Sequence, residues 1–303
     1  MLLRQLEYLA ALARERHFVR AAQACNVTQP TLSAGIKQLE EELGLLLVRR
    51  GRRFEGFTFE GEQILAWASR VEADTASLRQ EAASLRGGLQ GRLRLGVIPV
   101  ALPIVPLLTA LFAKRHPGVI LTVLSQPSIE IQRGLDEFSL DAGLTYLDNE
   151  PLNHVRTIPL YRERFLLFTP AGGALSEREE VSWVDAAALP LCMMTPDMQN
   201  RRILDATFRA AGTAPRPLLE TNSVLTISAL LRTGQWSSIL PQTFVKIVGP
   251  VDGLRIIPLV QPALTYGIGV VLPDREPLSP MARGLAALVA EAGVKAEFEA
   301  VGE

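Results

Sequence analysis

The chain has few of the residues on which redox chemistry and metal binding depend. Its 303 residues include two cysteines, Cys25 and Cys192, and three histidines, His17, His116 and His154. These residues are far apart and show no metal-ligand spacing, so the sequence predicts neither a metal site nor a disulfide framework. The cysteines are expected to be buried and unpaired.

Long apolar segments are also missing from the sequence. No stretch reaches the roughly eighteen apolar residues of a membrane-spanning helix, and the first residues lack the basic and apolar segments of a secretory signal. We therefore expect a soluble, cytoplasmic protein that has no membrane partner. A chain of 303 residues is long enough for two or three domains with full cores.

The net charge of −1 does not by itself indicate a nucleic-acid-binding protein. The charge is unevenly distributed, however. Residues 1–57 carry nine Lys or Arg and six Asp or Glu, a balance of +3, whereas the remainder carries −4. Contact with a nucleic acid is therefore expected at the N-terminal end.

Residues 28–44 have the marked start and end of a helix. Thr28 is suited to cap it through its hydroxyl, Pro30 falls in its first turn, and Gly44 suits the left-handed conformation that ends a helix. Apolar residues recur between these ends at helical spacing and predict one buried stripe. This stripe consists of Leu32, Ile36, Leu39 and Leu43.

A second face of this helix carries Gln29, Ser33 and Lys37, spaced four residues apart. Amide, hydroxyl and ammonium groups at the start of a helix are suited to read base edges in the DNA major groove. An ordinary surface helix explains the same pattern when the segment is considered alone. The residues predicted to contact DNA from this segment are Thr28, Gln29, Pro30, Thr31, Ser33 and Lys37.

The preceding residues favour DNA binding. Residues 2–16 have the apolar period of an amphipathic helix, and residues 18–25 predict a short second helix. Ala21 and Ala22 let two helices approach closely, and Asn26 suits the turn before the third helix because it tolerates positive φ. A short helix, a brief turn and a longer helix form the helix-turn-helix pattern.

Residues 45–61 predict a β-hairpin wing, because apolar runs flank a basic tip that contains a glycine. A solvated charge run is the usual explanation of such a cluster. Its position next to a helix-turn-helix favours contact with phosphates, which fixes register without reading sequence. The wing residues predicted to bind DNA are Arg50, Arg52 and Arg53.

The order of these motifs resembles the N-terminal domain of LysR-type transcriptional regulators. The resemblance covers the first ninety or so residues closely and the rest in general layout. Ala34 departs from the pattern, since many members have arginine there, and this leaves the operator preference open. The matching segments are residues 3–9, 17–22, 27–33 and 38–44 in the helices and 57–61 at the end of the wing.

Residues 62–86 contain no proline or glycine and show a heptad pattern of apolar and small residues. A helix lying on its own domain is one interpretation. A two-chain coiled coil is favoured, because the seam is narrow and the resemblance implies dimerisation through this helix. Such a dimer presents two recognition helices to a near-palindromic operator. The seam consists of Ile64, Ala68, Val71, Thr75, Leu78, Ala82 and Leu85.

From residue 92 the pattern alternates strand and helix, which predicts a parallel α/β sheet. The resemblance implies two Rossmann-like lobes similar to periplasmic binding proteins, with two crossings of the chain near Leu160 and Thr265. The expected domains are a winged helix-turn-helix (1–61), a linker helix and hinge (62–91) and an effector-binding domain (92–303), whose lobe one comprises 92–160 and 266–303 and lobe two 161–265.

Folds of this kind bind ligands at the carboxyl ends of strands, in the crevice between the lobes. A helix beginning near Met198 would direct N–H groups at this crevice and favour an anion. Val100 and Ala101 stand where family members often have Ser or Thr, which allows a ligand with an apolar part. A plain cap or turn is the alternative for each residue. The predicted effector-binding residues are Val100, Ala101, Ser125, Ser128, Thr145, Thr195, Gln199, Asn200 and Asn222.

The sequence shows no nucleophile elbow, phosphate-binding loop or metal ligand set, so no catalytic residue and no cofactor are predicted. The alternatives are an enzyme or a transport-type binding protein fused to a DNA anchor, and a purely architectural DNA-binding protein. We expect instead a LysR-type regulator, nucleoid-associated when bound to DNA, that responds to a small organic acid or other anion. Its expected partners are double-stranded DNA, the effector, further copies of the chain in a homodimer or homotetramer, and RNA polymerase.

Overall fold

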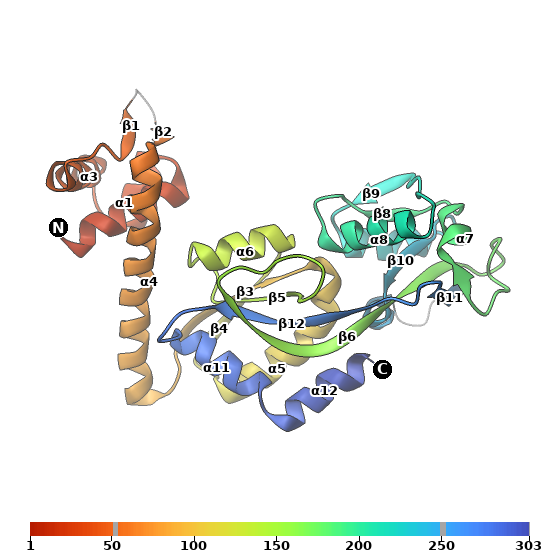
Figure 1. Ribbon diagram of the computed structural model, residues 1–303. Helices are drawn as coiled ribbons and strands as arrows, with labels where there is room; N and C mark the ends of the chain where they lie inside the picture. The colour runs from red at the N-terminus through yellow and green to blue at the C-terminus, as the bar shows by residue number, and fades with distance from the viewer. Residues whose placement is uncertain (51–53, 249–252, 303) are drawn as a thin grey trace. The chain divides into compact units, whose positions relative to one another are not determined.

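The structure, a computed structural model, describes residues 1–50, 54–248 and 253–302 and divides into two compact units (Figure 1). The smaller unit is Met1–Gly88 and the larger is Leu89–Glu303. Each unit has a hydrophobic core of its own. None of the helices in the described ranges combines the length and apolar character needed to cross a membrane.

The smaller unit is a winged helix-turn-helix followed by one long helix. The predicted stripe is buried at Leu32, Ile36 and Leu39, whereas Leu43 is 36% exposed. The Thr28 hydroxyl accepts a hydrogen bond from a backbone N–H, and Gly44 has the left-handed conformation, as predicted. The elements are α1 (Leu3–Glu15), α2 (Phe18–Ala24), α3 (Gln29–Leu43), β1 (Val48–Arg50), β2 (Phe54–Phe57) and α4 (Phe59–Gly87).

Two contacts in this unit hold α3 in place and have no signal in the sequence. The ring of Tyr8 on α1 lies so close to Gly35 that a Cβ there would be 2.6 Å from a ring carbon. The buried Glu40 carboxylate accepts hydrogen bonds from the backbone N–H groups of Leu47 at 2.9 Å and Val48 at 3.1 Å. Glu40 therefore fixes the start of the wing to the recognition helix.

The long helix α4 packs its first half against its own domain. Ala68 is fully buried within the unit, and Ile64 and Val71 lie against the same core. The prediction that Ala68 belongs to a two-chain seam is therefore wrong, because its own chain already covers the side chain. Further along α4, Leu78 and Leu85 are 70% and 80% exposed.

The larger unit contains an eight-stranded sheet within the described residues, in the order β4-β3-β5-β12-β6-β11-β7, with β10 also paired to β6. A separate pair, β8 and β9, is parallel. The strands are β3 (Gly91–Val97), β4 (Val119–Ser125), β5 (Ala142–Tyr146), β6 (Val155–Pro170), β7 (Val181–Ser182), β8 (Cys192–Met194), β9 (Leu219–Thr221), β10 (Ser238–Pro241), β11 (Leu254–Val260) and β12 (Thr265–Pro273).

Helices cover both faces of this sheet in lobe one, where α6 lies on one side and α5 and α11 on the other (Figure 1). The helices of the larger unit are η1 (Pro99–Ile104), α5 (Val105–Arg115), α6 (Ser128–Asp136), α7 (Trp183–Ala187), α8 (Gln199–Ala210), α9 (Val224–Leu231), η2 (Gln242–Phe244), α10 (Val245–Val248), α11 (Pro280–Val289) and α12 (Ala292–Gly302).

The predicted parallel arrangement holds for β4, β3 and β5 in lobe one, and lobe two has the further parallel pairs β7 with β11 and β8 with β9. β12 is antiparallel to β5 and to β6, and its register with β6 runs from Thr265 opposite Arg164 to Pro273 opposite Val155. β6 then continues into lobe two, where it pairs with β10 and β11. The two predicted crossings are thus two long neighbouring strands, which place the lobes on one continuous sheet.

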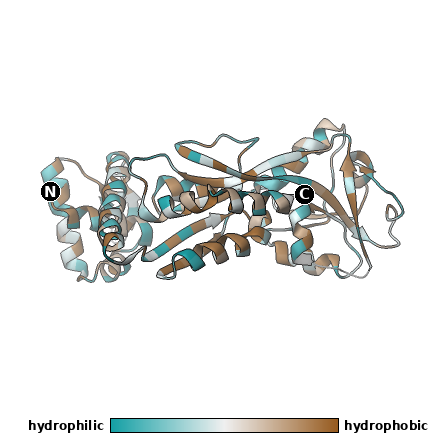
Figure 2. Ribbon diagram, turned by 90° about the horizontal axis from the view of Figure 1, so that it is seen from below, coloured by the Kyte–Doolittle hydropathy of each residue, from teal (hydrophilic) through white to brown (hydrophobic). Residues whose placement is uncertain are grey.

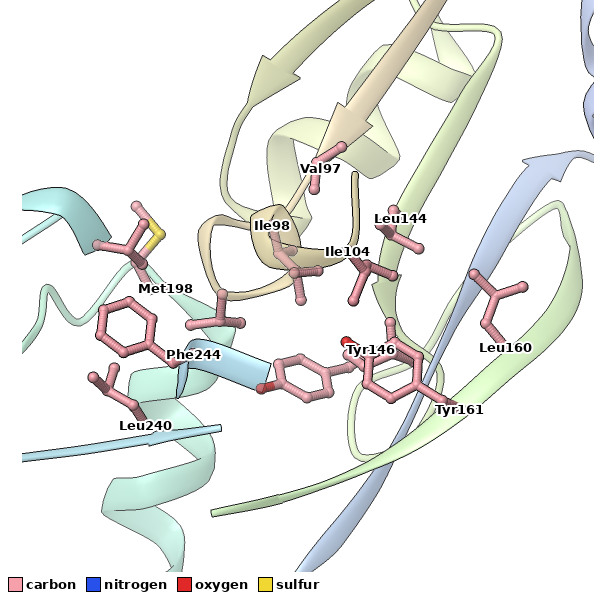
Figure 3. Close-up of a cluster of buried hydrophobic side chains, with 14 of the residues drawn as sticks. Val97, Ile98, Ile104, Leu144, Tyr146, Leu160, Tyr161, Met198, Leu240 and Phe244 are labelled. Atoms are coloured by element: carbon pink, nitrogen blue, oxygen red, sulfur yellow. The ribbon is translucent and has the colours of Figure 1, made fainter. Parts of the chain in front are cut away.

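One cluster of buried side chains runs through both lobes. The strands of the larger unit carry long hydrophobic stretches (Figure 2). At the junction, Tyr146 and Ile104 of lobe one lie near Phe244 and Met198 of lobe two (Figure 3), and η1 packs against η2. The junction between the lobes is therefore built from side chains of both.

Candidate DNA-binding surface and effector crevice

The predicted recognition face lies on the surface of α3. Gln29 is exposed and Ser33 half-buried, and the Gln29 Nε2 lies 3.5 Å from the Ser33 hydroxyl oxygen. Lys37 is exposed and pairs with Glu41 at 3.4 Å. Ion pairs this exposed contribute little to stability, so the ammonium can exchange Glu41 for a phosphate or base edge. The hydroxyl oxygen of Thr31 lies 2.8 Å from that of the capping Thr28.

The wing is formed by β1 and β2, which pair in antiparallel fashion. Arg52 and Arg53 lie outside the described residues, and so does the side chain of Arg50. Arg49 is described and exposed. Phosphate contact by the wing therefore stays a prediction.

Three of the predicted effector residues meet between the lobes. Thr145 of lobe one donates a hydrogen bond to the Gln199 side-chain oxygen at 3.4 Å, and the Gln199 amide donates to Asn149 at 2.8 Å. The Asn200 amide nitrogen lies 3.5 Å from the Tyr146 hydroxyl. Since Gln199 and Asn200 begin α8 in lobe two, the first turn of α8 ties the lobes together.

The other predicted effector residues differ in burial and in their hydrogen bonds. Val100 and Ala101 are fully buried in η1 and belong to the hydrophobic core cluster of the larger unit. Ser128 begins α6 and accepts a hydrogen bond from Arg202. Ser125 and Asn222 are exposed, and neither side chain is hydrogen-bonded to the residues at the start of α8.

Two polar atoms at the start of α8 have no hydrogen-bond partner, although they are buried. These are the Thr195 hydroxyl oxygen and the Asn200 side-chain oxygen. Buried polar groups are nearly always paired. Turning the Asn200 amide would present its N–H donors at the same place. These groups and the N-terminus of α8 are chemically suited to hydrogen-bond a polar ligand.

A buried carboxyl group that the sequence analysis missed lies in the same region. Glu163 of β6 is fully buried and accepts hydrogen bonds from the hydroxyls of Tyr146 at 2.6 Å and Tyr161 at 3.2 Å. Burial raises the pKa of this carboxyl to about 8, and the two hydroxyls oppose part of that shift. Glu163 is therefore mostly neutral at pH 7 and does not repel an anion nearby.

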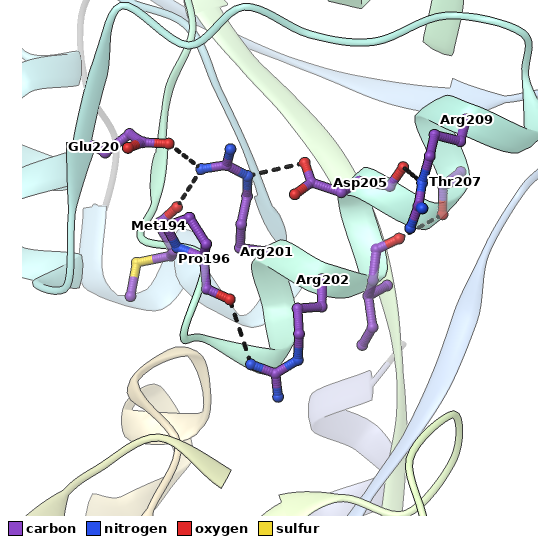
Figure 4. Close-up of polar contacts among 9 residues, drawn as sticks. Met194, Pro196, Arg201, Arg202, Asp205, Thr207, Arg209 and Glu220 are labelled. Atoms are coloured by element: carbon purple, nitrogen blue, oxygen red, sulfur yellow. Dashed lines mark hydrogen bonds and ion pairs between the residues drawn. The ribbon is translucent and has the colours of Figure 1, made fainter. Parts of the chain in front are cut away.

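Two neighbouring arginines on α8, also missed, have different surroundings. Arg201 donates within lobe two, to the Met194 carbonyl at 2.8 Å, Glu220 at 2.6 Å and Asp205 at 2.9 Å (Figure 4). Its side chain is only 9% exposed, and these partners all belong to lobe two. Arg201 is thus a structural residue that holds α8 on β8 and β9.

Arg202 instead reaches across the crevice. Its Nε and Nη2 donate to the two carboxylate oxygens of Glu150 at 2.6 and 2.8 Å, and Nη2 also donates to Ser128 at 3.2 Å. Its Nη1 donates to the carbonyls of Asp197 at 2.5 Å and Pro196 at 3.4 Å. Glu150 and Ser128 belong to lobe one, so this guanidinium links the lobes.

The cysteines are placed where thiol chemistry is disfavoured. Cys192 is fully buried in β8, and burial raises its thiol pKa to about 11. Cys25 is half-buried in the smaller unit, and burial also raises its pKa. Within the described ranges, no three His, Cys, Asp or Glu residues are grouped to hold a metal ion.

Models of known families match both units. Residues 3–62 match bacterial regulatory helix-turn-helix proteins of the lysR family, and residues 86–293 match the LysR substrate binding domain. The chain is 29% identical over 279 residues to the DNA-binding transcriptional dual regulator OxyR of Escherichia coli K12, covering 92% of this chain and 91% of OxyR. It is 30% identical over 288 residues to a probable hydrogen peroxide-inducible genes activator of Mycobacterium avium, covering 94% and 92%.

Solved structures of full-length regulators have the same fold. A cysteine-to-aspartate variant of OxyR from Pseudomonas aeruginosa superposes with a TM-score of 0.77 at 25% identity, covering 96% of each chain. CbnR in complex with its target DNA superposes with a TM-score of 0.65 at 20% identity, covering 95% of this chain and 99% of CbnR. The second likeness concerns the fold alone.

Proposed function

The chain belongs to the LysR family of DNA-binding transcriptional regulators, and from this premise we propose that it controls an operon in response to a small organic acid bound between its lobes. Members of this family regulate transcription and are not enzymes, which confirms the prediction that the chain has no catalytic role. The proposal concerns the effector, its site and the assembly.

The observation that carries the proposed effector site is the pair of unpartnered buried atoms on Thr195 and Asn200 at the start of α8. Hydroxyl and amide groups at a helix N-terminus suit a carboxylate. The apolar Val100 and Ala101 of η1 suit the carbon skeleton of such an acid. The neutral Glu163 carboxyl adds no negative charge to this region at pH 7.

Asn200→Ala is expected to weaken the response to the effector by about tenfold to a hundredfold, because a hydrogen bond to a charged group contributes roughly 1.5–3 kcal/mol. DNA binding without effector should not change. The measurement is DNA footprinting across a panel of small organic acids. Asn153→Ala is the control, since Asn153 is exposed. An unchanged response in Asn200→Ala would remove this residue from the site, and a footprint that no small molecule alters would sink the sensor idea.

Peroxide is the alternative effector, because relatives of this chain are named hydrogen peroxide-inducible activators. Peroxide sensing by thiols needs an accessible thiolate, often beside a resolving cysteine. The two cysteines here lie in different units, and Cys192 is fully buried with a pKa of about 11. These facts disfavour a thiol-based peroxide sensor.

Hydrogen peroxide is accordingly expected to leave operator binding by the parent protein and by Cys192→Ser indistinguishable. Mass spectrometry should find Cys192 unmodified at peroxide concentrations that oxidise a free thiol. A peroxide-dependent footprint that disappears in Cys192→Ser would overturn this and make peroxide the signal.

Recognition of the operator is proposed to depend on α3. Gln29→Ala is expected to cost roughly 1–3 kcal/mol at the operator and little on unrelated DNA, because a side chain that reads a base edge contributes discrimination of that size. Gel-shift titrations on both sequences measure it. An equal loss on both would mean that Gln29 only positions the backbone.

The assembly is proposed to be a homodimer through α4, with a homotetramer formed when the larger units also pair. Two features support it: the exposed Leu78 and Leu85 on α4, and the edge strand β4, where Ile120 is 57% and Leu124 38% exposed. Edge strands with exposed apolar residues tend to pair with another chain. Contact with RNA polymerase belongs to the same proposal and is assigned to no residue.

A further inference from the structure

The ion pair between Arg202 and Glu150 links the lobes although both partners remain accessible to solvent. The side chain of Arg202 is 36% exposed and that of Glu150 is 31% exposed. Ion pairs with this much exposure contribute little to stability. A carboxylate from solution can therefore compete with Glu150 for the guanidinium.

The guanidinium is held in place independently of Glu150. Its Nη1 donates to the carbonyls of Asp197 and Pro196, in the segment just before α8. These contacts leave Nε and Nη2 directed at Glu150 and Ser128. A planar fork with two parallel N–H groups is the arrangement that recognises a carboxylate through both oxygens.

We propose that Glu150 occupies the position of a carboxylate effector, and that the effector acts by displacing Glu150 from Arg202 and Ser128. Arg202 is then the group that determines specificity for acids, and Glu150 is a competitor within the chain. This inference rests on the proposed function, because it takes the effector to be an acid bound between the lobes.

Displacement of Glu150 would also affect a second hydrogen-bonded contact between the lobes. The neighbouring Asn149 accepts the hydrogen bond from Gln199, three residues before Arg202 on the same helix. A shift of the segment 149–150 therefore acts on both links to α8. A ligand that replaces Glu150 binds more tightly when the segment 149–150 is released from α8 than when it is bound there. A switch requires such a difference in ligand affinity between two states.

Acetate is the probe, because it has the carboxylate of a glutamate side chain and little else. Binding of ¹³C-labelled acetate to the full chain is measured by NMR relaxation, with sodium chloride at equal ionic strength as the reference. Glu150→Ala is expected to bind acetate up to about fivefold more tightly than the parent protein, since it removes the internal competitor. The double variant Glu150→Ala, Arg202→Ala should lose this gain.

Glu130→Ala is the matched control. Glu130 also pairs with an arginine, Arg133, at 2.9 Å, but within the single helix α6. Its removal should leave acetate binding as in the parent. Glu150→Gln, which keeps the shape of the side chain and removes its charge, repeats the test if Glu150→Ala does not fold.

Acetate binding that is no tighter in Glu150→Ala and Glu150→Gln than in the parent, or that survives in the double variant, would overturn the inference. The proposed function is tested separately by the footprint across organic acids. A footprint that responds to an acid while the acetate test fails would keep the sensor and discard the displacement of Glu150. Acetate binding without any responsive footprint would keep the carboxylate site and discard the sensor.

Discussion

Replacing Leu78 and Leu85 with aspartate is expected to abolish the pairing of chains through α4, so that a homodimer falls to monomers and a homotetramer falls to pairs held by the larger units. The helix α4 has 29 residues, roughly 44 Å at about 1.5 Å per residue, whereas α1, against which it packs, has 13 residues and spans roughly 20 Å. The second half of α4 therefore extends beyond its own support. Isolated helices of about 12–15 residues are marginal in water, so this half needs a partner along its exposed leucines.

The measurement is sedimentation velocity, with circular dichroism to show that the variant remains folded. Ala76→Asp with Ala83→Asp is the matched control, because it places the same charges seven residues apart at exposed positions outside the seam. Val71 is unsuited to the test, since it packs on the core of its own unit. Native sedimentation by the Leu78, Leu85 variant would exclude this seam as the principal contact. Dissociation should also weaken operator binding, since a monomer reads one half-site.

The recognition helix could be predicted because its signals are local. A capping Thr28, a terminating Gly44 and an apolar period lie within one segment, and each acts on its own neighbours. The burial of Ala68 could not be read in the same way. The heptad pattern identifies an apolar face of α4 but does not say whether α1 or a second chain covers it.

The long strands β6 and β12 were only partly predicted, for a related reason. β6 places Arg156, Arg162 and Arg164 among its apolar residues, and antiparallel pairing with β12 depends on residues about a hundred positions away. The strand order of the sheet is thus a property of long-range pairing.

In the proposed effector site, too, the residues with local sequence signals could be predicted and the contacts between distant residues could not. Thr145, Gln199 and Asn200 could be named because they follow strands or begin a helix, where ligands bind in folds of this type. Glu150 and Arg202 are 52 residues apart and meet only when the lobes close. The burial of Glu163 could not be predicted, because a single acidic residue in a strand is normally expected to be exposed to solvent.

Burial of the neutral Glu163 carboxyl should make the larger unit lose stability as the pH rises. The pKa of Glu163 is about 8 in the folded chain, against 4.5 for a glutamate in water. As the pH rises, Glu163 therefore loses its proton in the unfolded chain before it does so in the folded chain. The stabilisation that the neutral Glu163 carboxyl contributes to folding is full below about pH 4.5 and is lost as the pH rises through 8. The difference of about 3.5 units, at about 1.36 kcal/mol per unit, corresponds to on the order of 5 kcal/mol.

Glu163→Gln is expected to remove this dependence, because an amide has no proton to lose. At pH 9 it should unfold at a higher temperature than the parent, whereas near pH 5 the two should differ little, since an amide retains hydrogen-bonding groups for Tyr146 and Tyr161. Thermal unfolding followed between pH 5 and 9 measures this, with the exposed Glu179→Gln as the control. Other groups titrate equally in the parent and the variant, so the difference between the two curves isolates Glu163. Parallel curves over the whole range would show that Glu163 is already ionised in the folded chain, and that the crevice then carries a negative charge that any acidic effector must overcome.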